Sequence, residues 1–248
     1  MRLTAETYQR IAQSQTRGFV SRGADFLESR FHSFISNRQI ERSSLECTIK
    51  DSYDFTVENG RPSELLAVRI ACAKLCFGSF FLNDIRYVAL KEIVNQQLEC
   101  LVLTDDDPIF SYILKYKADW TMDWFLQKHD YIWTIAASRQ VIPQGAPEWL
   151  DGMGVIEKLF EVEERSTTLI PELGRRRFFE LLERKAYDCL PVEAGEQARV
   201  LLTIGQFYDG YNCFNDPLRP RWYGVLNPDD MELTRWQIQK VYTPEQGN

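Results

Sequence analysis

The sequence predicts an all-α protein, an irregular bundle or array of about eight or nine helices. Two observations support this prediction. Apolar residues recur at helical spacing through most of the 248 residues, in segments separated by short polar loops with capping residues. No β-rich run alternates with these segments, as the βαβ units of a parallel sheet would require.

The N-terminal segment predicts one interrupted helix or two consecutive helices over residues 4–41. Its apolar residues stand one or two helical turns apart: Phe26, Leu27, Phe31, Phe34 and Ile35. Residues 45–60 are less regular and end in Asn59-Gly60, which is a turn signal. A short strand over residues 47–57 is the alternative for this segment.

The firmest helix covers residues 62–78. It starts with Pro62 at a first-turn position and ends at Gly78, which is the usual asymmetry of helix ends. Because it is apolar nearly all round, we expect it to be a central helix. A second helix follows over 83–103 with Asn83 or Asp84 as its N-cap, and a third covers 108–120.

The second half of the chain repeats this pattern. The predicted helices cover residues 120–142, 146–162, 174–190, 193–211 and 229–242. The segment PQGAP, residues 143–147, is the best hinge in the chain. It divides an N-terminal helical part, 1–142, from a C-terminal helical part, 147–248, and we expect the two to pack as one unit.

The chain is acidic, with a formal net charge of −7 and a pI of about 5.1. This disfavours a general nucleic-acid binder, which needs a surplus of Lys and Arg, and it suits a binder of something basic. No signal peptide and no apolar run long enough for a membrane span are visible. The six cysteines include no Cys-x-x-Cys pair, and we expect Cys72 and Cys76 to be buried apolar residues. The chain is expected to be cytoplasmic with reduced thiols.

Catalytic motifs are absent from the sequence. The chain has two histidines, His32 and His129, and neither belongs to a metal-binding pair. Asp130 beside His129, with Asp119 and Asp123 one helical turn apart, makes a carboxylate metal site conceivable. Solvated helix charges are the better interpretation of Asp119 and Asp123. No nucleophile elbow or phosphate-binding loop is present. We therefore expect no catalytic residues, no cofactor and no metal.

Acidic clusters supply the candidate partner-binding residues. Asp105, Asp106 and Asp107 precede one predicted helix, and Asp229, Asp230 and Glu232 stand at the start of the last one, where helix capping is the simplest role. The functional alternative is a surface that docks a basic partner. The aromatic stretch FYDGYNCFNDPLRPRWYG, residues 207–224, predicts a packing corner with Asp209, Asp216 and Arg219 as contacts at the rim of a binding surface.

Three segments carry a resemblance to a known family. The first is 65–78 followed by 83–101, in which one helix ends at a Gly corner and another begins. The second is HDYIWTIAASRQVI, residues 129–142. The third is 178–224, with a Leu-Leu helix, an Ala-rich helix and then Trp222-Tyr223. In this order they resemble the two-part, all-helical immunity proteins that partner PoNe-type polymorphic DNase toxins of competing bacteria.

The resemblance implies a protein without enzymatic activity. It would bind the nuclease domain of a secreted, basic toxin and block the active site or the DNA-binding face. A helical adaptor, regulatory protein or secretion-system component is the alternative. A third hypothesis is an enzyme with an aromatic pocket near His129 and Asp130, lined by Trp120, Trp124, Tyr131 and Trp133.

Overall fold

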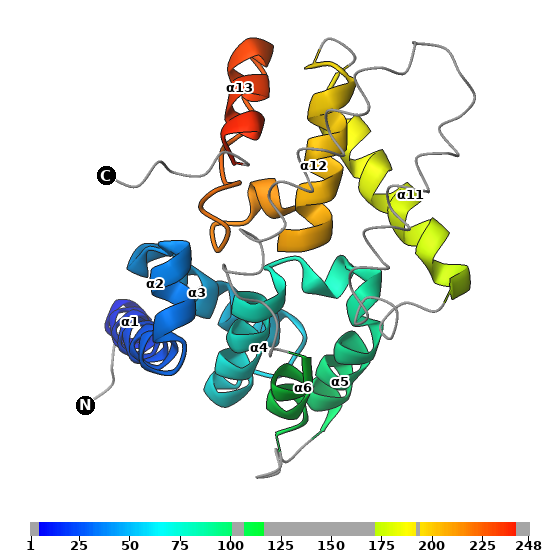
Figure 1. The fold of residues 1–248 in the computed structure, drawn as a ribbon. Coiled ribbons are helices and arrows are strands. Elements are labelled where there is room, and N and C mark those ends of the chain that lie inside the picture. Colours follow the sequence, from blue (N-terminus) through cyan, green and yellow to red (C-terminus); the bar gives the residue numbers. More distant parts are fainter. Residues whose placement is uncertain (1–4, 101–106, 117–171, 192–193, 242–248) are drawn as a thin grey trace. The chain divides into compact units, whose positions relative to one another are not determined.

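The computed structural model describes residues 5–100, 107–116, 172–191 and 194–241 (Figure 1). These residues form nine α-helices and several short 3₁₀ helices, with no strand among them, which confirms the all-α prediction. The helices predicted at 120–142 and 146–162, and the hinge at 143–147, lie outside the described residues.

The chain divides into two compact units. Unit 1 comprises residues 1–79 and 89–120, and unit 2 comprises 80–88 and 121–248. The predicted division differs on one point within the described residues, because it assigns 80–88 to the N-terminal part. The structure groups this short segment with the C-terminal helices, and its side-chain contacts, described below, explain why.

Unit 1 is built around one apolar helix. Its helices are α1 (Ala5–Arg30), α2 (His32–Arg38), α3 (Arg42–Glu58), α4 (Glu64–Phe77), α5 (Val88–Glu99) and α6 (Pro108–Tyr116), with Val88 itself counted in unit 2. Helix α4 contacts α1, α3 and α6, and ten of its residues are buried, as expected for a central helix. It begins two residues later than predicted: Pro62 precedes the N-cap Ser63, whose Oγ accepts a hydrogen bond from the Leu66 amide at 3.2 Å.

Helix α3 replaces the irregular segment and the alternative strand expected at 45–60. Its buried face consists of Leu45, Thr48, Ile49, Ser52 and Thr56. Each of the three hydroxyl groups donates to a backbone carbonyl one turn earlier, at 2.7–2.8 Å, so it can be buried at little cost. The helical stripe was hidden in the sequence because half of it is polar.

The N-terminal helices are consecutive, one of the two predicted alternatives. Helix α1 continues to Arg30, and Phe31 leaves helical geometry with φ −122° and ψ 27° before α2 starts. Phe31 is buried, so the bend also places an apolar side chain in the core of unit 1. Helix α2 ends at Gln39, whose φ of 55° is left-handed, and the Gln39 amide donates to the Ser36 carbonyl.

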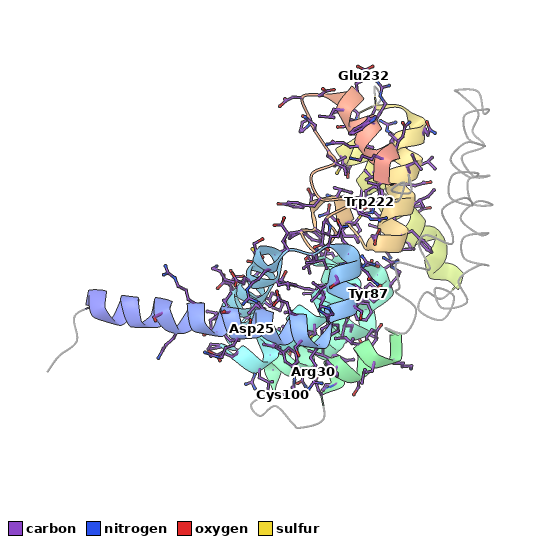
Figure 2. The ribbon with its side chains drawn as sticks, turned by 60° about the vertical axis from the view of Figure 1, so that its left-hand side comes forward. Asp25, Arg30, Tyr87, Cys100, Trp222 and Glu232 are labelled. Carbon is purple, nitrogen blue, oxygen red and sulfur yellow. The ribbon has the colours of Figure 1, made fainter. Side chains whose placement is uncertain are left out.

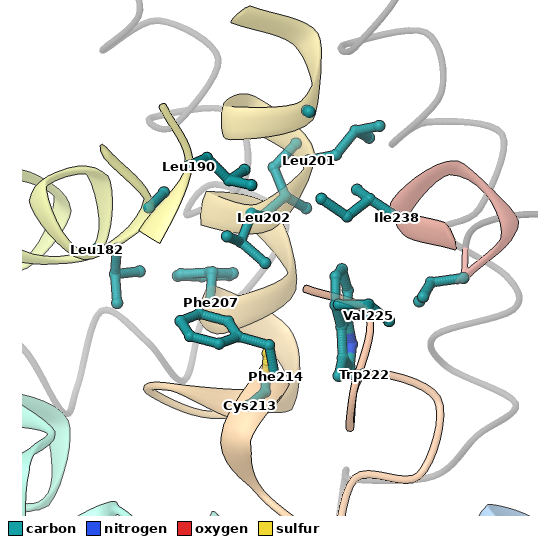
Figure 3. Packing of buried hydrophobic residues seen from close by; sticks show 14 of the residues in the cluster. Leu182, Leu190, Leu201, Leu202, Phe207, Cys213, Phe214, Trp222, Val225 and Ile238 are labelled. Atoms are coloured by element: carbon teal, nitrogen blue, oxygen red, sulfur yellow. The ribbon is translucent and has the colours of Figure 1, made fainter. Parts of the chain in front are cut away.

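Unit 2 packs three helices around the second apolar core. Its elements are the 3₁₀ helices η1 (Phe81–Asn83), η2 (Ile85–Tyr87) and η6 (Cys213–Asn215), with α11 (Glu172–Cys189), α12 (Glu196–Asp209) and α13 (Met231–Val241). The helix predicted from residue 83 therefore begins as 3₁₀ turns, and α5 starts only at Val88. Figure 3 shows that Leu201 and Leu202 of α12 lie between side chains of α11 and Ile238 of α13.

Gly205 allows the closest packing in unit 2. It lies in the middle of α12, directly against the indole of Trp222. A Cβ atom at this position would penetrate the aromatic ring at Cζ2. Trp222 is completely buried (Figure 3), so it has no room to move away. The glycine is therefore required by space and not by backbone conformation.

Candidate functional site

The stretch 207–224 folds into a closed network of hydrogen bonds at the end of α12. The indole Nε1 of Trp222 donates to the carboxylate of Asp209 at 2.9 Å. The Nε of Arg219 donates to the backbone carbonyl of Asp209 at 2.7 Å, and its Nη1 donates to the carbonyl of Leu218. The carboxylate of Asp216 accepts the Leu218 amide at 2.9 Å. The polar groups that stand out in the sequence are thus directed at one another.

This arrangement corrects the expected position of three candidate residues. Asp209 is 9%, Asp216 1% and Arg219 2% exposed, so none of them lies on the rim of a surface. Charge and loop composition favoured exposure, because unpaired Asp and Arg are rarely buried. Here each charged group has internal hydrogen-bond partners, which offset the desolvation cost of burying it. The expectation of a packing corner is the part of the prediction that the structure supports.

Cys213 lies in the middle of this network and has an altered acidity. Burial, reinforced by the negative charges of Asp209 and Asp216, raises the pKa of the Cys213 thiol well above its ordinary value. The thiol therefore stays protonated at neutral pH. Since the thiolate is the nucleophilic form, Cys213 is built as a packing residue and not as a reactive one.

A second buried polar cluster was not predicted from the sequence. The Arg86 guanidinium pairs with the Asp84 carboxylate, with Nη2 and Oδ2 2.6 Å apart, and both side chains are almost fully buried. The guanidinium also donates to the backbone carbonyls of Phe207 and Gln206 in the last turn of α12. Asp84 and Arg86, two opposite charges close together in a segment with many apolar residues, were the signal in the sequence.

Arg86 acts as a C-terminal cap that comes from a distant part of the chain. The last carbonyls of a helix lack intrahelical partners and carry partial negative charge, so a guanidinium satisfies both needs. The cation also lies 4.9 Å from the ring centre of Phe178 and 5.8 Å from that of Phe207. These contacts explain why residues 80–88 belong to unit 2.

The acidic clusters are partly used as helix caps. Asp107 accepts the Phe110 amide at 2.9 Å and pairs with Arg69, so it caps α6 and joins α6 to α4. Asp105 and Asp106 lie outside the described residues. Asp230 accepts the Leu233 amide at 2.9 Å and caps α13. Asp229 and Glu232 are exposed. Partner binding by the exposed residues stays a prediction.

The negative charge of the chain is unevenly distributed. The described residues hold equal numbers of basic and acidic side chains. The net charge of −7 therefore arises from the remaining segments, chiefly 117–171 and 101–106. Any long-range attraction of a basic partner would originate mainly from these segments.

The last candidates are the two histidines and the possible metal ligands, considered within the described parts of the chain. His32 is exposed on α2, and the described residues contain no group of three or more His, Cys, Asp or Glu side chains placed to hold a metal. His129 and its aromatic neighbours lie outside the described residues. Among the described helices, none is long and apolar enough to cross a membrane. Comparison of the chain with protein families, curated proteins and solved structures gives no match.

Proposed function

We propose that this protein binds and neutralises a bacterial toxin, in the manner of the immunity proteins that its sequence resembles. The observation that carries the proposal is the closed network at 207–224. Catalysis needs polar groups that are free to meet a substrate. In this stretch the Asp209 carboxylate meets an indole and the Arg219 guanidinium meets backbone carbonyls, which is the construction of a scaffold.

A rigid scaffold suits an inhibitor. A surface that is already formed before binding loses little conformational freedom on association, so more of the contact energy appears as affinity. The acidic excess outside the described residues supports a basic partner, such as a nuclease domain that must hold phosphates. The charge would speed encounter, and the contacts at the interface would set the lifetime of the complex.

Co-expression tests the proposal directly. The nuclease domain encoded beside this gene is expressed in a host that lacks both genes, with and without this protein. We expect this protein to restore growth, to keep plasmid DNA intact and to co-purify with the nuclease domain. If no toxin is encoded nearby, or if deleting this gene leaves the growth of a toxin-exposed strain unchanged, the proposal fails. A neighbour-encoded partner that co-purifies without any protection would indicate an adaptor.

Charge reversal tests whether residues 105–106 supply the electrostatic attraction for the nuclease domain. Asp105→Lys with Asp106→Lys should slow association with the nuclease domain at low salt, by about tenfold or more, and high salt should remove the difference. Asp107 is left intact because it caps α6 and pairs with Arg69. Glu92→Lys with Glu99→Lys, two exposed residues of α5 outside the acidic clusters, is the control with the same change of charge. Equal association rates for all three proteins would exclude the 105–106 segment.

A further inference from the structure

Helix α13 has one face that packs on unit 2 and an opposite face that nothing in the described chain covers. Thr234, Ile238 and Val241 are buried, and Thr234 is held by reciprocal hydrogen bonds with the backbone of Asn227. Trp236 stands on the opposite side and is 56% exposed. Tryptophan is enriched in protein interfaces, because its large apolar surface gains from burial while its N–H keeps a polar contact.

Charges are arranged symmetrically about Trp236. Glu232 lies four residues before it and Lys240 four residues after it, so the three side chains share one helical stripe. Both charged residues are exposed, and the Lys240 ammonium lies 5.2 Å from the Trp236 ring centre. Figure 2 shows Glu232 at the start of α13. The stripe is therefore acidic at one end, aromatic in the middle and basic at the other end.

Such a stripe is complementary to itself when it is reversed. In a two-fold arrangement each residue of one copy meets the symmetry-related residue of the other. Two α13 helices that run antiparallel would place Trp236 against Trp236 at the axis. They would also place Glu232 of each copy opposite Lys240 of the second copy, giving two ion pairs around an aromatic centre. A parallel arrangement would bring like charges together instead.

We propose that the α13 stripe of Glu232, Trp236 and Lys240 is a homodimer interface that joins two copies of this protein in antiparallel orientation. The helix has 11 residues, or roughly 16 Å, so the contact is smaller than a standard interface of about 800 Å² per partner. The dimer is accordingly weak and forms at high protein concentration. The inference does not depend on the identity of any toxin.

Sedimentation velocity on the full chain tests the proposal. Between about 5 and 500 μM, a range that covers weak association, the average mass should rise from the monomer value of 29.0 kDa toward twice that value. Trp236→Ala should keep the protein monomeric. Tyr223→Ala is the matched control, because Tyr223 is an equally exposed aromatic residue (58%) outside α13 and should leave dimerisation unchanged.

Charge exchange distinguishes this arrangement from unspecific association. Glu232→Lys alone and Lys240→Glu alone should each weaken the dimer by about tenfold, because each places like charges opposite one another. The double variant restores opposite charges and should recover most of the affinity. A protein that is monomeric over the whole concentration range overturns the proposal. A dimer that the double variant fails to restore, or that Tyr223→Ala weakens as much as Trp236→Ala, overturns it as well.

Discussion

The two units use their arginines differently. In unit 1 the guanidinium groups meet carboxylates: Arg42 contacts Asp25, Glu28 and Glu46, and Arg69 contacts Asp107. In the described part of unit 2 the buried guanidinium groups reach backbone carbonyls, and Arg86 does so in addition to its pair with the Asp84 carboxylate. Arg86 donates to Phe207 and Gln206, Arg199 to Leu190, and Arg219 to Asp209 and Leu218.

This difference has a physical consequence. An exposed Arg–carboxylate pair contributes little to the free energy of unfolding, because water competes for both ions. A buried guanidinium at the end of a helix is costly to remove, because the carbonyls and any counter-charge that it meets lose a charged donor in a buried site. Unit 2 should therefore be the more sensitive unit to single polar substitutions, and four experiments test this comparison.

The largest expected effect is at Arg86. Arg86→Met approximates the length of the side chain but leaves the Asp84 carboxylate buried without its counter-charge and removes the charged donor of the Phe207 carbonyl. We expect a loss of about 3–5 kcal/mol in the free energy of unfolding, measured by urea denaturation. Hydrogen exchange should show the loss of protection first in α11 and α12 and not in α3 and α4.

A double variant separates the buried charge from the loss of packing. Asp84→Asn together with Arg86→Met removes both charges while Asn still accepts hydrogen bonds, so it should recover a measurable part of the loss. A loss below about 1 kcal/mol in the single variant, within the range of exposed pairs, would contradict the comparison.

The next largest loss of stability is expected for Gly205→Ala, compared with Gly23→Ala in unit 1. Gly205→Ala would drive its methyl group into the Trp222 ring, and overpacking of this kind costs about 1–3 kcal/mol. Gly23→Ala in α1 would meet the buried Ile49 side chain at 2.9 Å, a smaller overlap than that of Gly205→Ala with Trp222, and alanine gains up to about 1 kcal/mol of helix propensity. We expect urea midpoints to rank Gly205→Ala clearly below Gly23→Ala. Equal midpoints would mean that the indole is not confined.

Alkaline pH probes the core of unit 2 through Cys213. The folded pKa of this thiol is raised, so its protonated form is retained in the native state while the unfolded thiol ionises above about pH 8.5. Stability is therefore complete below this pH and falls as pH rises, with a slope of up to about 1.4 kcal/mol per pH unit. Urea titrations from pH 8 to 10 should show a smaller fall in Cys213→Ala. Parallel curves would indicate that the thiol is hydrated.

The smallest effect should be at Arg42. This side chain joins α3 to α1, and its hydrogen bond with Asp25, together with the charge of Glu28, raises the pKa of the guanidinium. The network is exposed, so Arg42→Ala should lower the melting temperature less than any variant above, and added salt should reduce the difference. A shift as large as that of Arg86→Met would remove the contrast between the units.

The sequence predicts the helices of this fold better than their contacts. Helices α4 and α12 follow from apolar periodicity and from the glycines that end them. Helix α3 was not recognised because its hydroxyl residues bond to their own backbone, which a hydrophobic pattern does not register. The role of Arg86 depends on carbonyls more than 120 residues away, and no local pattern contains that information.

The candidate site shows the same limit. Sequence reasoning identified 207–224 as a packing corner, since its aromatic residues continue the apolar face of α12. It placed Asp209, Asp216 and Arg219 at the rim of a surface because charged side chains are usually exposed. That rule does not hold here, since each of the three is buried with a hydrogen-bond partner. The capping roles of Asp107 and Asp230 could be predicted, because an N-cap acts on amides two or three residues away.

The position of Arg86 in the chain also affects the order of folding during synthesis. The ribosome produces residues 80–88 long before the carbonyls that they cap, and 121 residues separate Arg86 from Phe207. At about 5–20 residues per second, this interval lasts roughly 6 to 24 s. Throughout it, the Asp84–Arg86 pair lacks the α12 carbonyl that it meets in the folded protein. The cap of α12 is therefore synthesised first and can act only after α12 has been translated.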